Sequence, residues 1–493
     1  MTESLLFILA FFVVYTEFSA VSEVTAMTIK LCSAAKGRLD RQLTSPVFTA
    51  RQIYRMTLPL ILDSLSIMFI NMLITALISS AGESSIAAVN LVSPLLGLIM
   101  CVLGGISAGG TVAVTQCFGG GDMVKTQQAA GHILWLTFLT GSLLGLVLIL
   151  FPRPILTALY PQAEPAIMEK AVSYMIQGTF SMIIFTVYSG VFSILRGLGE
   201  SQKCLCLTII INVSYLLFSI LFLNVLQMDI LGSALAQIFA RAVGALTALA
   251  FLFLPRDMPI RLRLEDVFSF QRPILSTILE VSIPFGLEQL FLAFGGILLT
   301  AMTVPLGTGA VVVNSIAGSL MGVTTAAAGA AGNLGITISG RCIGAGEKEH
   351  AFGYGCKMCA LALFLLAASA AIAYPFFPTM LTHLYHASPE VQEKTLELLR
   401  YILLPIFLFW PFSNVLPAIL RSGHDSVFPS VLSLASMWCV RIVCGYFLAY
   451  RMGMGLTGLW TAMWVEWAVR SIVLAFHFFR RKWLARAVPE RAV

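Results

Sequence analysis

Six ionisable residues lie inside long apolar stretches of this chain: Asp63, Arg241, Glu288, Arg441, Glu466 and Arg470. Placing such a charge at the centre of a bilayer costs roughly 2.5–3.5 kcal/mol on insertion scales. Each of them must therefore be paired, neutralised or exposed to a water-filled cavity. A carboxylate poised between desolvation, which favours its neutral form, and a nearby cation, which favours its charged form, can exchange a proton for a cation.

Two of the acids, Asp63 and Glu288, occupy matching positions in similar segments. Each lies four residues after a proline, Pro59 or Pro284. The match predicts one carboxylate at the same depth in each half of the chain, and it makes both residues candidates for cation coupling. A capping or packing role near the start of a helix is the alternative interpretation.

The remaining acid, Glu466, precedes Arg470 by four residues, a spacing that pairs side chains on one helix face. Arg441, on the preceding apolar stretch, could join them. The pattern favours a structural ion cluster, with cation coupling at Glu466 and Arg441 as the second possibility. Arg241 falls where the other half has Glu466, so the two halves are electrically unlike.

These residues belong to a duplicated sequence. The segment LRGLGES at 195–201 recurs as LRSGHDS at 420–426. Four further short sequence motifs also recur, each about 225 residues later in the chain. Membrane bundles with internal repeats and a central site are typical of secondary transporters. Arg196 and Arg421 of the repeated segment are expected just past helix ends, where a cation complements the helix dipole. They are interpreted as caps or conformational switches.

Apolar runs long enough to cross a bilayer, about 20 residues each, occur six times in each half. The fold class predicted is an all-α polytopic membrane protein with twelve transmembrane helices in two parallel-repeat six-helix lobes around a central cavity. The predicted divisions are an N-terminal extension at 1–50, a first lobe at 51–255, a linker at 256–273, a second lobe at 274–479 and a tail at 480–493. An apolar run at 5–21 fits an extra short span, an interfacial helix or translated leader before Met27.

Composition and charge agree with this class. Hydrophobic residues make up 58% of the chain and charged residues only 11%, whereas a soluble domain carries roughly 25% charge. Loops on the side of Arg51 and Arg55 hold 22 of the 30 Lys and Arg, and the positive-inside rule places that side in the cytoplasm. We therefore expect a multi-pass cell-membrane protein whose lobe ends and C-terminus are cytoplasmic. The net charge of +6 then reflects topology and not nucleic-acid binding.

Several function classes lack their sequence signatures. The ten cysteines lie in spans or on the predicted cytoplasmic side, so no disulfide framework is expected. No histidine pair at metal spacing lies within a span, and the ATP-binding pattern G-x-x-x-x-G-K-S/T does not occur. The sequence thus predicts neither an enzyme nor a cofactor or metal, beyond a coupling ion that is sodium or a proton. No obligate protein partner is indicated.

Several motifs resemble the MATE family of multidrug and toxin extruders. They are AAVNLVSP at 87–94, QCFGGGD at 116–122, LRGLGE at 195–200, IPFGLEQL at 283–290 and GRCIGAGE at 340–347. The likeness covers about residues 50–485. It implies two six-helix lobes at a V-shaped cavity and export of small organic cations or amphipathic compounds in exchange for sodium or protons.

The chain departs from many members of that family at acidic positions. Ile74 stands where many have an acid in the first helix, and Leu216 and its neighbour Tyr215 stand where some have one in the fifth. An acid of the seventh helix in other branches is Leu292 here, with Glu288 one turn earlier. Whether Asp63 takes over from the missing acids is left open.

Candidate residues for the substrate cavity are Gln289, Asn314, Trp410 and Phe412. Pro411, between Pro405 and Pro417, predicts a kink, because proline removes a backbone hydrogen bond. The leading hypothesis is cation-coupled efflux of organic compounds. A flippase or exporter of a lipid-linked or polar metabolite is the alternative, and its cavity should be basic.

Overall fold

The computed structural model describes residues 44–78, 83–162, 164–228, 230–254, 258–268 and 271–486. The chain forms two compact units, residues 1–54 and 55–493. The apolar segment at 5–21 and Met27 lie outside the described residues, as do parts of the predicted linker and tail. The side chain of Ile74 is likewise not described.

The first copy of the repeat consists of long helices joined by short turns. They are α3 (Ala50–Ile78), α4 (Glu83–Gly119), α5 (Met123–Leu150), α6 (Pro152–Leu159), α7 (Pro165–Gly197), α8 (Ser201–Ser219) with its π-helical extension η3 (Ile220–Val225), and α9 (Ile230–Phe253). A short helix, α10 (Leu264–Phe268), follows in the connection between the copies.

The second copy repeats this order. Its elements are α11 (Arg272–Thr303), η4 (Val304–Leu306), α12 (Thr308–Gly344), α13 (Lys348–Ala373), η5 (Tyr374–Phe376), α14 (Phe377–His383), α15 (Pro389–Ser422), α16 (Val427–Ala435), η6 (Ser436–Ile442), α17 (Val443–Tyr446), η7 (Phe447–Arg451), α18 (Gly455–Phe479) and α19 (Trp483–Arg486). The elements η6 and η7 are π-helical.

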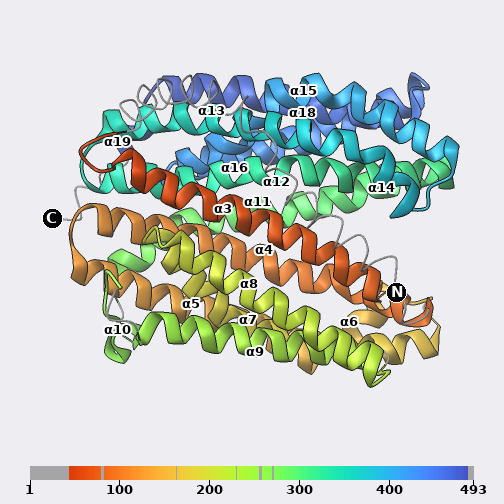
Figure 1. The fold of residues 1–493 in the computed structure, drawn as a ribbon, viewed down its shortest axis with the longest axis horizontal. Coiled ribbons are helices and arrows are strands. Elements are labelled where there is room, and N and C mark those ends of the chain that lie inside the picture. The colour runs from red at the N-terminus through yellow and green to blue at the C-terminus, as the bar shows by residue number, and fades with distance from the viewer. Residues whose placement is uncertain are drawn as a thin grey trace, which may run out of the picture. The chain divides into compact units, whose positions relative to one another are not determined.

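The predicted all-helical class is confirmed for the described residues, which contain helices and no strand. Eleven of these helical segments are long and apolar enough to cross a membrane, and α3, with 29 residues, occupies the place of the first predicted span. Figure 1 shows α5, α7, α8 and α9 together on one side of unit 55–493 and α13, α15 and α18 together on the other. Helices α4, α11 and α12 lie between these groups.

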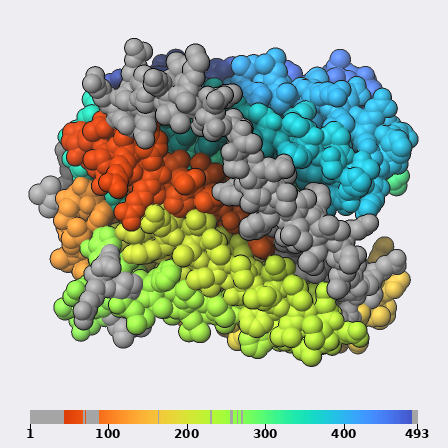
Figure 2. Space-filling model, in the orientation of Figure 1, coloured from red at the N-terminus to blue at the C-terminus, as the bar shows by residue number. Residues whose placement is uncertain are grey.

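Each copy has its own apolar core. One cluster joins α4, α5, α7, α8 and α9 around residues such as Ile133, Val191 and Leu207. A second joins α12, α13, α15 and α18 around residues such as Leu320, Leu366 and Trp467. Other faces of the same helices expose apolar side chains, including Leu217 at 61% and Leu246 at 69%, and Figure 2 shows α8 and α9 (yellow-green) at the surface. Exposed apolar faces on this scale are suited to lipid.

The turns that follow α7 and α15 have the same backbone shape although their residues differ. Gly199 has a φ of 70° in the first copy, and its counterpart His424 has a φ of 61° in the second. Left-handed backbone is easy for glycine and costs a residue with a Cβ roughly 1–2 kcal/mol. His424 therefore holds a strained position that the surrounding contacts must stabilise.

Candidate functional site

The acid of the second copy, Glu288 on α11, forms a tight ion pair. Arg421 Nη2 lies 2.6 Å from Glu288 Oε2, and Ser430 Oγ donates to the same oxygen at 2.7 Å. Glu288 is 2% and Arg421 6% exposed, and the Arg421 guanidinium lies 4.0 Å from the ring centre of Phe285. The pair therefore neutralises both charges inside the bundle. Arg421 lies in the last turn of α15, and not past the helix end as the sequence had predicted.

The acid of the first copy, Asp63 on α3, is equally buried but less well bound. Thr208 and Arg196 are polar side chains that lie near enough to its carboxylate to act on it electrostatically. Asp63 Oδ1 has no hydrogen-bond partner among the described residues. The two equivalent acids thus differ: Glu288 is held by an ion pair and a serine hydroxyl through Oε2, whereas Oδ1 of Asp63 has no hydrogen-bond partner among the described residues.

Arg196, in the last turn of α7, reaches the other copy of the repeat. Its Nη1 donates to Asn333 Oδ1 on α12 at 3.3 Å, and its carbonyl oxygen accepts from Thr337 Oγ1 at 3.2 Å. Here too the residue is inside the helix, which corrects the prediction of a position beyond its end. Arg196 thereby links the neighbourhood of Asp63 to the interface between the copies.

Helices α4 and α12 cross at their C-terminal ends, where the loops 119–122, 198–200, 344–347 and 423–426 meet. We call this end of unit 55–493, where Arg196, Arg341 and Arg421 lie in the last turns of their helices, the basic end. Gln116 Nε2 donates to Ser422 O at 2.7 Å, and Arg341 Nη2 donates to Leu198 O. A Cβ added at Gly344 would overlap the backbone of Gln116, and one at Gly119 would overlap the backbone of Arg341. Only glycine allows so close an approach, so the two copies are locked together at this end.

The predicted cluster around Glu466 is present. Arg470 Nη1 lies 3.0 Å from Glu466 Oε1 and Arg441 Nη1 3.9 Å from Oε2. Ser436 Oγ donates to Glu466 at 3.2 Å, and Arg470 Nη2 also donates to Ser413 O at 3.1 Å. Glu466 is therefore held mainly by Arg470 and Ser436, and Arg441 is its weakest partner.

Arg241, the counterpart of Glu466, has polar but uncharged neighbours. Its Nη1 donates to Ser181 Oγ at 2.6 Å, and its guanidinium lies 5.2 Å from the ring centre of Phe185. Gln237 donates to the hydroxyls of Tyr174 and Tyr215 beside it. No described acidic side chain forms an ion pair with Arg241, which agrees with the expectation that the halves differ electrically.

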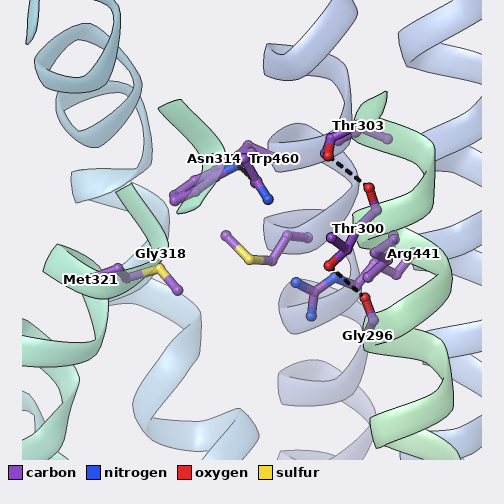
Figure 3. A pocket seen from close by; sticks show the side chains of 11 residues that line it. Gly296, Thr300, Thr303, Asn314, Gly318, Met321, Arg441 and Trp460 are labelled. Atoms are coloured by element: carbon purple, nitrogen blue, oxygen red, sulfur yellow. Dashed lines mark hydrogen bonds between the residues drawn. The ribbon is translucent and has the colours of Figure 1, made fainter. Parts of the chain in front are cut away.

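A cavity of about 200 Å³ lies within the second copy, between α11, α12, η6 and α18. Its walls are Gly296, Leu299, Thr300, Thr303, Asn314, Gly318, Met321, Arg441, Leu459, Trp460 and Met463. Figure 3 shows the Arg441 guanidinium directed into this space beside Thr300. Arg441 itself comes from the π-helical η6, and such segments are frequent at functional sites.

The other predicted site residues are distributed along the helices. Of the predicted cavity residues, Asn314 lines this space, whereas Gln289, Trp410 and Phe412 are not among its walls and stay predictions. Pro59 and Pro284 lie inside α3 and α11, and Pro411 lies inside α15. The helix α15 continues through its three prolines from residue 389 to 422.

Sequence reasoning missed Gln116 and Arg341 as contacts between the copies. Their signal was available, because both precede the recurring glycines by three residues and share the offset that relates Asp63 to Glu288. The sequence comparison did not indicate that Gln116 and Arg341 are equivalent, because an amide and a guanidinium differ chemically. The structure shows that both donate to a backbone carbonyl.

Comparison with known proteins decides the family. The family model described as MatE matches residues 59–222 and 284–447, one match in each copy of the repeat. The chain belongs to the MATE family of transporters. The resemblance expected from the motifs is thereby confirmed, and the family's matches begin at Pro59 and Pro284, the prolines that precede the two buried acids.

The alignments with related proteins cover nearly the whole length of this MATE protein. A "Probable multidrug resistance protein NorM" of Thermotoga maritima is 24% identical over 455 residues, covering 90% of this chain and 94% of that protein. The "Multidrug resistance protein NorM" of Burkholderia vietnamiensis is 25% identical, with 88% and 95% covered. A structure described as the outward-facing conformation of a multidrug resistance MATE family transporter has a TM-score of 0.82 at 20% identity, with 88% and 96% covered. This structural match confirms the fold.

Proposed function

We propose that this MATE protein exports organic compounds, as a multidrug transporter, in exchange for sodium or protons by alternating access. Membership of the family and the names of its NorM relatives support the transport class. The basic end would face the cytoplasm, in accord with the positive-inside rule. In this arrangement the close contact between α4 and α12 at the basic end, which we call the lock, closes the cytoplasmic side. Reorientation of the transporter requires this contact to open.

The observation that carries the coupling proposal is the state of Asp63. One of its carboxylate oxygens has no hydrogen-bond partner among the described residues, so a proton or a sodium ion has a vacant acceptor to bind. Arg196 acts on this carboxylate and also binds Asn333 of the other copy. A change of charge at Asp63 must therefore alter the free energy of the contact between the copies.

Glu288 is the second coupling candidate, but its carboxylate already accepts two hydrogen bonds, one of them from Arg421. Protonating it would leave a buried guanidinium without its counter-ion, which is strongly unfavourable. Glu466 is similarly engaged with Arg470 and Ser436. The geometry therefore favours Asp63 for coupling and a structural role for the other two acids.

The test is efflux of ethidium from proteoliposomes, with a sodium gradient and a pH gradient imposed separately. Wild type should respond to one of the gradients, and Asp63→Asn should lose that response while still binding the dye. Arg153→Gln, which removes an exposed ion pair with Glu169, is the control and should transport normally. Efflux that is absent under both gradients contradicts the proposal, and gradient-driven efflux by Asp63→Asn assigns coupling elsewhere.

A further inference from the structure

Arg441 carries the surplus positive charge of a buried cluster. Glu466 is the one acid that Arg441 and Arg470 share among the described residues, and it lies 0.9 Å closer to Arg470, at 3.0 Å against 3.9 Å. Two guanidinium groups and one carboxylate leave a net charge of +1. A charge held in an apolar bundle is costly unless it is compensated, so this site favours an anion.

The excess charge is accessible from the cavity. The Arg441 side chain is 26% exposed, whereas those of Glu466 and Arg470 are 2% and 11% exposed. Figure 3 shows its guanidinium extending from the wall into the space opposite Met321. A ligand in the cavity would therefore meet Arg441 and not the acid behind it.

The other polar walls restrict which atoms a ligand can use. Thr300 Oγ1 donates to Gly296 O at 3.0 Å, and Thr303 Oγ1 donates to Thr300 O at 2.7 Å. Their protons are thus committed within α11. Asn314 Oδ1 accepts from Trp460 Nε1 at 2.9 Å, which fixes the orientation of the amide. Its nitrogen donates to no acceptor among the described residues, so its N–H groups are available to a ligand.

The size and the remaining walls indicate a small amphipathic group. The cavity measures about 200 Å³, below the roughly 300–1,000 Å³ typical of a pocket for a whole drug molecule. Leu299, Met321, Leu459 and Met463 supply apolar surface, and the flexible thioethers of methionine adapt to rings of varied shape. One surplus cation matches a monoanion such as a carboxylate, whereas a phosphate dianion would need a second.

We propose that this cavity is a subsite for the carboxylate end of a small aromatic or aliphatic acid, with Arg441 and the Asn314 amide as its donors. The assignment deepens the proposed export function and, as a statement about substrate, rests on it. It makes amphipathic compounds that bear an acidic group part of the substrate range. Arg441 then acts as a substrate ligand, and not as a member of a cation-coupling site.

The test compares binding of 2-naphthoate and 2-naphthamide, which differ in charge and not in ring, to the purified full-length protein by calorimetry. Wild type should bind the naphthoate about ten-fold more tightly, because a hydrogen bond between a guanidinium and a carboxylate is stronger than one between a guanidinium and a neutral amide. Arg441→Gln should abolish this preference. Arg241→Gln, which removes a partly buried arginine of the first copy that forms no ion pair with a described acid, is the matched control and should retain it.

A second variant keeps the test decisive if Arg441→Gln fails to fold. In Asn314→Asp the oxygen that accepts from Trp460 is preserved, but the donating nitrogen becomes a carboxylate oxygen that repels the ligand. Naphthoate binding should be lost and naphthamide binding retained within about two-fold, because the new carboxylate repels only the charged ligand. Equal affinity of wild type for the two compounds, or a preference that survives both substitutions, would overturn the proposal.

Failure of this inference can be told apart from failure of the proposed function. Binding is measured without any gradient, and ethidium efflux is measured without any acid. Efflux without selective naphthoate binding would support the export function and contradict the acidic subsite. Selective naphthoate binding without efflux would support the subsite and contradict the export function.

Discussion

Gln116 and Arg341 occupy the same place in the two copies of the repeat, and each donates a hydrogen bond to the turn that ends a helix of the opposite copy. Gln116 binds Ser422 O, and Arg341 binds Leu198 O. Gln116 also receives a contact from His424 Nε2 at 2.7 Å. The lock at the basic end is thus nearly symmetric in geometry, although an amide performs on one side what a guanidinium performs on the other.

Removing either donor should loosen the basic end. Gln116→Ala is expected to raise the rate at which maleimide labels Cys342, which is fully buried. Arg341→Ala should do the same for Cys117, in proteins that retain only the cysteine being labelled. Loss of a hydrogen bond of about 1 kcal/mol corresponds to an increase of about five-fold in the open population. Arg153→Gln at an exposed position should leave both rates unchanged, and unchanged rates in the two lock variants would contradict the assignment.

The close crossing of α4 and α12 predicts a sharp difference between two glycines. Gly344→Ala places a Cβ against the backbone of Gln116, whereas Gly353→Ala on α13 has open space around it. Overpacking of this kind costs about 1–3 kcal/mol, so Gly344→Ala should lower the thermal unfolding midpoint in detergent. Gly353→Ala should leave it unchanged or raise it, because alanine favours helix over glycine. Equal midpoints for the two variants would mean that the crossing is not tightly packed in solution.

The two buried acids should differ in their contribution to stability. Glu288→Gln leaves Arg421 without its counter-ion, and breaking such a pair typically costs about 3–5 kcal/mol. Asp63→Asn should destabilise less, because one oxygen of Asp63 already lacks a partner. Thermal unfolding of the two variants in detergent measures the difference. Adding Arg421→Leu to Glu288→Gln should recover part of the loss, and no recovery would argue against a direct pair.

His424 should make stability depend on pH. Burial lowers the pKa of His424 below its ordinary value of 6.5, and the carboxylate of Glu280, 3.8 Å away, offsets this only in part. Below pH 6.5 the unfolded chain therefore binds a proton that the folded chain does not, and stability falls as the pH is lowered.

The comparison of wild type with His424→Gln between pH 7.5 and 5.5 checks this expectation. The variant should lose less of its unfolding free energy over the interval, because glutamine does not titrate. His350→Gln, which removes a histidine whose side chain is 41% exposed, should behave like wild type. A His424→Gln protein with the full wild-type loss would assign the acid sensitivity to other groups.

The amino-acid sequence alone was sufficient for the features that depend on local or repeated patterns. Each span could be predicted because an apolar helix must be long enough to cross the bilayer, whatever it packs against. The Glu466–Arg470 pair could be predicted because helix geometry fixes side chains four residues apart. The equivalence of Asp63 and Glu288 followed from comparing the chain with itself.

Tertiary structure decided which partner each buried charge meets. Arg196 and Arg421 are equivalent in sequence, yet Arg421 binds the acid of its own copy and Arg196 binds Asn333 of the other. A long arginine side chain can reach several acceptors, so its choice depends on the distances between helices, and residues far apart in the chain set those distances. The cavity beside Arg441 has the same origin, because its walls come from four separate segments. No pattern within any one of these segments encodes the space between them.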